Sequence, residues 1–177
     1  YGVIGEGYNN PEQPSCMYKL YADNPRNQIE HMSFGGLWVG GIGGDDDGVH
    51  VSTAIIDGVF EAGEEGFEFT NSAAAGDTIR IRSTIVTSPY FDPRAVSHQD
   101  FCCNFTDTNL RVPGTDFEIP NHSPLGLRIH LESYAWNFSF TDAFVILNYT
   151  ITNISDHRID ELYTGLWADA SVGNMNY

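Results

Sequence analysis

The sequence predicts an all-β protein, an antiparallel β-sandwich with long irregular loops. Several segments alternate apolar and polar side chains with a period of two, as a strand with one buried face does. No segment shows the longer period of an amphipathic helix of normal length. A chain of 177 residues that is 41% hydrophobic is long enough to form one such domain around a true core.

Segment 143–153, AFVILNYTITN, is the strongest strand candidate, because it is β-branched and aromatic and holds no glycine or proline. Alternate residues share one face: Val145, Leu147, Tyr149 and Ile151. Phe144 and Ile146 make the first half apolar on both faces. We therefore expect this end to lie deep between two sheets, with a partner strand on either side.

The chain begins with a short extended piece, residues 1–8. Its candidate strand residues are Tyr1, Val3, Ile4 and Tyr8. Residues 9–14, NNPEQP, form a stiff spacer, which divides the chain into a strand and spacer, 1–14, and a sandwich domain, 15–177. An apolar strand set apart in this way either folds back as an edge strand of its own sheet or pairs with another molecule.

The other strand candidates follow in order: residues 16–21, 29–44, 49–60, 78–87, 125–136 and 162–168. Glycine pairs in 29–44 indicate bulges or a close approach of two backbones. In 78–87 we expect Arg80 and Arg82 to face water or to pair with nearby carboxylates. The alternation in 125–136 predicts that Leu127, Ile129 and Leu131 face inward.

The stretch 90–120 is rich in turn residues and is predicted to be a long surface loop. It carries Cys102 and Cys103, and Cys16 is the third cysteine. Neighbouring cysteines cannot both pair with Cys16, so the simplest oxidised form joins Cys16 to one of them. The alternative is three reduced, buried cysteines in a cytosolic protein.

N-x-S/T sequons are frequent in this chain. The glycosylation candidates are Asn104, Asn137, Asn148 and Asn153. A further sequon at Asn121 is weakened by the proline at position 124. Together with the cysteine bridge, these sites favour an exported protein.

The charge excludes several classes of partner. Acidic residues number 24 against eight basic ones, for a net charge of -16, so nucleic acid and anionic membranes would repel the protein. No apolar run is long enough to cross a bilayer. Asp45, Asp46 and Asp47 form the densest carboxylate cluster, which fits either a calcium site or a solvated acidic turn. We expect no other cofactor.

No catalytic motif stands out, and we expect the protein not to be an enzyme. There is no G-x-S-x-G elbow, and the six histidines lack H-x-H or H-E-x-x-H spacing. Among 24 acidic residues some glycosidase-like pair can always be nominated, so such a pair has no discriminating power.

The segments HSPLGLRIHLESYAW, TDAFVILNYTITNIS and LYTGLWADASVGN, with SHQDFCCNFTDT and GGLWVGG upstream, carry a resemblance. Together they resemble the N-terminal β-sandwich region of large secreted bacterial proteins, whose strands show D-x-F-V-I-L-x-Y-x-I-x-N followed by Y-x-G-L-x-x-D. The resemblance implies an Ig-like fold and an extracellular or cell-surface location. It implies no known activity.

Two functional hypotheses follow. In the first, the protein is a structural subunit of an extracellular bacterial filament, a helical homopolymer in which residues 1–8 of one copy complete the sandwich of another, similar in logic to donor-strand pili. In the second, it is a secreted carbohydrate- or surface-binding module, in which Trp38, Trp136 or Trp167 stacks on sugars. Core packing is the structural alternative for these tryptophans.

Overall fold

The computed structural model describes residues 3–5, 17–19, 28–30, 32–44, 46, 48–54, 68–71, 78–141 and 143–170. Within these ranges the protein has ten strands and no helix. The strands form two four-stranded sheets and one two-stranded ribbon, and all named strands pair antiparallel. The predicted all-β, antiparallel class is therefore confirmed.

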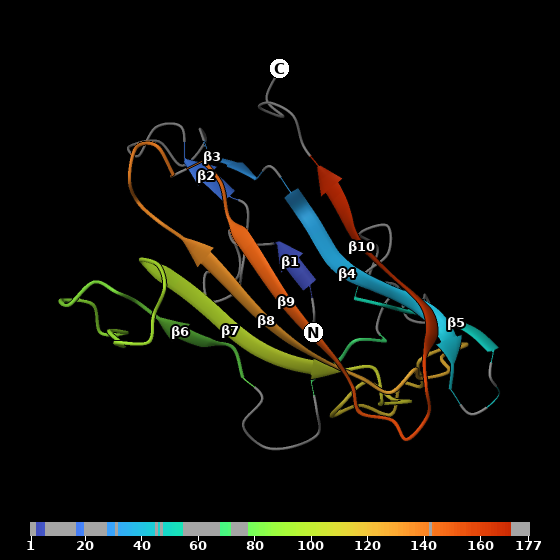
Figure 1. Ribbon diagram of the computed structural model, residues 1–177. Coiled ribbons are helices and arrows are strands. Elements are labelled where there is room, and N and C mark those ends of the chain that lie inside the picture. The colour runs from blue at the N-terminus through green and yellow to red at the C-terminus, as the bar shows by residue number, and fades with distance from the viewer. Residues whose placement is uncertain are drawn as a thin grey trace.

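The first sheet is organised around its longest strand, β4 (Met32–Gly43). One edge of β4 pairs with β10 (Asp160–Ala170), and the other edge pairs with β1 (Val3–Gly5) and β5 (Gly48–Thr53). Figure 1 shows β10 running beside β4. At Gly41 of β4 a close neighbour requires glycine, because a Cβ there would lie 2.8 Å from the Ile159 side chain.

The second sheet has the order β6-β7-β8-β9. Its strands are β6 (Arg80–Arg82), β7 (Gln99–Thr106), β8 (Leu127–Ala135) and β9 (Ile146–Asn153). A separate ribbon joins β2 (Met17–Lys19) to β3 (Gln28–Glu30). In Figure 1 the second sheet forms a layer distinct from β4 and β10.

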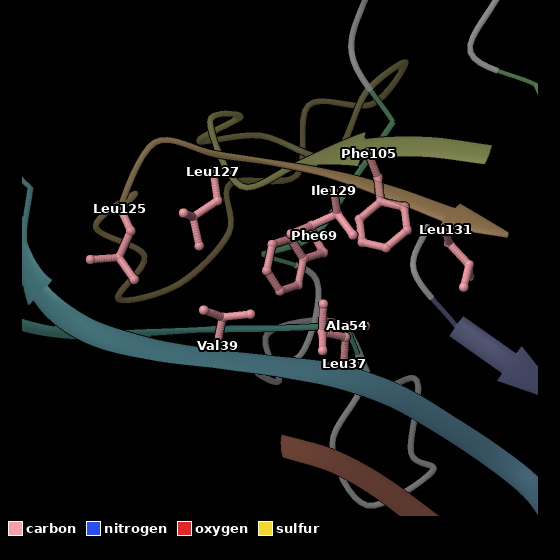
Figure 2. Close-up of a cluster of buried hydrophobic side chains, with 9 residues drawn as sticks. All are labelled: Leu37, Val39, Ala54, Phe69, Phe105, Leu125, Leu127, Ile129 and Leu131. Atoms are coloured by element: carbon pink, nitrogen blue, oxygen red, sulfur yellow. The ribbon is translucent and has the colours of Figure 1, made fainter. Parts of the chain in front are cut away.

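The core lies between the two sheets, which makes the architecture sandwich-like (Figure 2). Its buried residues are Leu37, Val39, Ala54, Phe69, Phe105, Leu125, Leu127, Ile129 and Leu131. Figure 2 shows the side chains of β4 facing those of β7 and β8. The predicted inward face of segment 125–136 is confirmed, and full burial of each aliphatic side chain contributes about 1.5–3 kcal/mol.

The placement predicted for segment 143–153 is wrong. Its ordered strand, β9, lies at the edge of the second sheet and pairs only with β8 among the described strands. Phe144 and Ile146 are 47% and 44% exposed instead of deep between sheets. The strands that lie between two partners in this sheet are β7 and β8. One face of β9 does pack against the core, as the alternation predicted: Leu147, Tyr149 and Ile151.

Two further boundaries differ from the sequence prediction. The stretch 90–120, predicted to be a loop, contains β7, one of the two inner strands of its sheet. The strand predicted for 78–87 is shorter than expected, because only β6 has strand structure there. After β6 the chain turns back on itself, since the Ser83 N–H donates to the Tyr90 carbonyl and the Asp92 N–H donates to the Ser83 carbonyl.

The first strand folds back within its own chain. In β1, Val3 pairs with Gly36 and Ile4 pairs with Gly35, and Ile4 has no exposed surface. Of the two alternatives for the N-terminal segment, the structure therefore shows the edge strand of the chain's own sheet. Donation of this strand to another copy requires that β1 first leave β4. Tyr1, Tyr8 and the proline spacer lie outside the described residues.

Candidate functional site

Two complementary motifs face each other in the first sheet. Residues 36–40 of β4, GLWVG, pair antiparallel with residues 163–167 of β10, YTGLW. The register sets an aromatic residue opposite a glycine in three successive outward pairs: Trp167 with Gly36, Trp38 with Gly165, and Tyr163 with Gly40. Each ring therefore lies beside a position that has no side chain.

These three pairs lie on the outer face of the sheet. Leu37 and Val39 alternate with them on β4 and belong to the buried core. Successive side chains of a strand point to opposite faces, so Trp38, Tyr163 and Trp167 point away from the core. We call these three residues the aromatic face.

The aromatic face is accessible. The Tyr163 side chain is 73% exposed, and Trp38 and Trp167 are partly exposed. A Cβ built at Gly165 would meet no atom within 4 Å, so open space lies beside the Trp38 position. Val51, on the far side of Gly40 from Tyr163, is also exposed and extends the apolar surface onto β5. Exposed rings of this kind can stack on the apolar C–H faces of sugars.

The structure brings two of the three predicted tryptophans together and leaves the third apart. Trp136 follows β8 in the other sheet, where its ring centroid lies 6.4 Å from that of Tyr134. Tyr163 was not recognised as a candidate site residue. The complementary patterns G-x-W-x-G and Y-x-G-x-W were a usable signal, but they become informative only when the register of β4 and β10 is known.

The second sheet carries a polar network on its outer face. The Arg82 guanidinium donates to the Glu132 carboxylate at 2.7 Å, and the Tyr134 hydroxyl donates to the same carboxylate at 2.6 Å. The Tyr134 hydroxyl lowers the pKa of Glu132, and Arg82 lowers it further, against the opposing effect of burial. Glu132 therefore acts as a fixed anion that orders its neighbours.

The predicted cysteine pairing is only partly covered by the structure, because Cys16 lies outside the described residues. Cys102 is a buried free thiol on β7 whose Sγ donates to Glu132 Oε1 at 3.8 Å. Burial raises its pKa to about 11, so the thiol is protonated and unreactive at neutral pH. Cys103 is half-buried and packs against the core. A bridge from Cys16 to one of the two neighbouring cysteines therefore stays a prediction.

The sequon asparagines differ in accessibility. Asn104 accepts a hydrogen bond from the His130 ring at 2.8 Å, and Asn153 donates to the His157 carbonyl at 2.8 Å. Asn137, Asn148 and Asn153 are exposed, whereas Asn104 is half-buried. Geometry therefore favours modification at the exposed positions, and glycosylation itself stays a prediction.

In the acidic turn, only Asp46 of the three aspartates is described. Its carboxylate accepts the Gly48 N–H at 2.8 Å and pairs with the His50 ring at 2.6 Å, and the His50 hydrogen bond lowers the Asp46 pKa. Asp45 and Asp47 lie outside the described residues. In the part of the chain that the structure covers, no group of three or more His, Cys, Asp or Glu side chains is placed to hold a metal ion.

Comparisons with protein-family models, with curated proteins and with solved structures found no match to this chain. Within the described ranges, a helix of the length and apolarity that a membrane crossing requires is absent. The functional inference therefore depends on the geometry of the two sheets.

Proposed function

We propose that the protein is a secreted, non-enzymatic module with an Ig-like β-sandwich that binds a neutral polysaccharide through the aromatic face. The observation that carries this proposal is the register of β4 and β10, which sets Trp38, Tyr163 and Trp167 on one outward face, each opposite a glycine. Because no side chain stands opposite these rings, they present apolar surface to a ligand.

The length of the aromatic face and the net charge of the whole chain define the ligand. Tyr163 and Trp167 are four residues apart on one strand, about 13 Å at the usual rise of a β-strand. That span suits an oligosaccharide segment better than a single sugar. The net charge of -16 disfavours an anionic polysaccharide, so the ligand is a neutral one.

Binding to soluble neutral glucans, xylans and mannans, measured by affinity electrophoresis and calorimetry, tests the proposal. Tyr163→Ala and Trp167→Ala should each weaken binding at least fivefold, since loss of an aromatic contact removes about 0.5–1.5 kcal/mol beyond its buried area. Phe140→Ala is the matched control, because Phe140 is 79% exposed but belongs to a loop of the other sheet.

Two results would overturn the proposal. One is the absence of saturable binding to every neutral polysaccharide tested. The other is an equal loss in the Phe140→Ala control. The first result has a structural explanation, in which the three rings stabilise the sheet by covering the neighbouring glycines. In that case Trp167→Ala lowers the unfolding temperature although no polysaccharide binds.

Strand exchange between copies is the second candidate function, a filament built by the N-terminal strand. It is supported by Ile4, which is fully buried and pairs with Gly35 at the edge of β4, so this edge accommodates an apolar strand. It is also supported by β9 and β10, each of which pairs with a single strand among those described. Exposed edges of this kind are templates for pairing with another chain.

A chain that lacks residues 1–10 tests strand exchange. A synthetic peptide of residues 1–10 should raise its unfolding temperature, and a peptide carrying Ile4→Asp should not. Electron micrographs should show filaments of the full chain and only monomers of the shortened one. Filaments that persist after the deletion would reject this candidate.

A further inference from the structure

A cleft of about 300 Å³ lies on the outer face of the second sheet, away from the aromatic face. Its floor is a row across three strands, in which Arg80 of β6 pairs with Cys102 of β7, and Cys102 pairs with Glu132 of β8. One wall comes from the loop after β6, which contributes Asp92 and Arg94. Strands and loop together make a concave polar site.

The loop wall is held in place by the buried carboxylate of Asp100. This carboxylate accepts hydrogen bonds from the Val96 N–H at 2.8 Å, from the Ser97 N–H at 2.8 Å and from the Ser97 hydroxyl at 2.6 Å. The Ser83 hydroxyl also donates to the His98 carbonyl at 2.6 Å. The cleft is therefore formed before any ligand arrives, which lowers the entropic cost of binding.

Arginine is concentrated here. Arg80, Arg82 and Arg94 line the cleft, and they are three of only eight basic residues in a chain of net charge -16. Three guanidinium groups therefore line one cleft. Arginine is also the side chain best suited to carboxylates, because its planar fork donates two parallel hydrogen bonds.

Two of these arginines already have counter-ions, and the third has none in the described chain. Arg82 pairs with Glu132 at 2.7 Å, and Arg94 makes a two-point contact with Asp92 at 2.7 and 3.0 Å. Arg80 is exposed and forms no ion pair with a described residue. In addition, the Nε–H of Arg82 is buried and has no acceptor among the described residues, so a lining residue of the cleft keeps an unsatisfied donor.

We propose that this cleft binds a small hydroxylated carboxylate of the hexuronic acid type, with Arg80 as its anchor. Among the three arginines that line the cleft, Arg80 alone lacks an ion pair with a described residue, which matches a ligand with one carboxylate. The other polar groups suit hydroxyls: Glu132 and Asp92 are acceptors, and the His130 ring, whose Nδ1 faces Asn104, turns Nε2 toward Glu132 at 3.7 Å. This site is independent of polysaccharide binding at the aromatic face.

Sodium D-glucuronate is the probe, and D-glucose is its uncharged counterpart. Titration of the full chain, followed by amide NMR shifts, should show saturable binding of glucuronate at millimolar concentration, with shifts centred on β6, β7 and β8. Acetate should compete, and glucose should not bind. Equal binding of glucose and glucuronate, or no saturable shift with glucuronate, overturns the proposal.

Two matched variants locate the anchor. Arg80→Gln should weaken glucuronate binding at least tenfold, because a charge-assisted two-point contact is lost. Arg128→Gln removes an exposed cation from β8 that does not line the cleft, and it should leave binding unchanged. Both variants should keep the wild-type unfolding temperature. An equal loss in both variants would show general charge attraction and would reject the assignment.

Discussion

The Ser52 hydroxyl on β5 donates a 2.9 Å hydrogen bond to the buried carboxylate of Asp107, which follows β7. This bond joins the two sheets. The same carboxylate accepts the Leu125 N–H at 2.9 Å and the Leu127 N–H at 2.6 Å, so it also fixes the entry into β8. One carboxylate thus bonds to both layers at this end of the sandwich.

We predict that Asp107→Asn lowers the free energy of unfolding by about 2–4 kcal/mol, because an amide group would turn donors toward donors. Ser52→Ala removes one of the three bonds and should cost about 1–2 kcal/mol. Urea unfolding followed by tryptophan fluorescence measures both. A loss below about 0.5 kcal/mol in Asp107→Asn would show that the carboxylate is not a cross-sheet tie.

A pair of isoleucines tests the assignment of core and edge. Ile129 on β8 has no exposed surface, whereas Ile146 at the start of β9 is 44% exposed. Ile129→Ala should lower the free energy of unfolding by about 2–5 kcal/mol, and Ile146→Ala by less than about 1 kcal/mol. The comparison uses chemically identical changes on adjacent strands. Equal losses would place β9 in the interior after all.

The Cys102 thiol predicts a pH dependence in the alkaline range. Burial raises its pKa from 9.0 to about 11, so between these values the unfolded chain releases the proton and the folded chain keeps it. The folded state then binds more protons, and stability falls as the pH rises through this window. The free energy of unfolding should drop more for the wild type than for Cys102→Ser between about pH 8 and about pH 10.5. Parallel losses in the two proteins would contradict a buried thiol.

Sequon accessibility predicts an order of glycosylation. When the chain is secreted from a eukaryotic host, Asn137 should be modified to a higher fraction than Asn104, whose amide is engaged by His130. Mass spectrometry of tryptic glycopeptides measures the occupancy. Ser139→Ala, which removes the Asn137 sequon, is the control. Full occupancy at Asn104 with none at Asn137 would reverse the expected order.

Local alternation predicted the faces of several strands correctly. In segment 125–136 the residues expected inward, Leu127, Ile129 and Leu131, are the buried ones. These predictions succeeded because the two-residue period of a strand is a property of the backbone and needs no knowledge of its neighbours. The all-β class followed from the same period.

The position of each strand in its sheet was decided by tertiary structure. An apolar segment such as 143–153 is compatible with an inner strand or an edge strand. In the structure it forms the edge strand β9, and β8 is the inner strand beside it. The register that sets Trp38 opposite Gly165, and the fold of the loop that carries Arg94 to the cleft, both depend on contacts between residues distant in the chain. Such contacts form only when two complementary surfaces meet, and the sequence of one segment does not identify the segment with which it will pair.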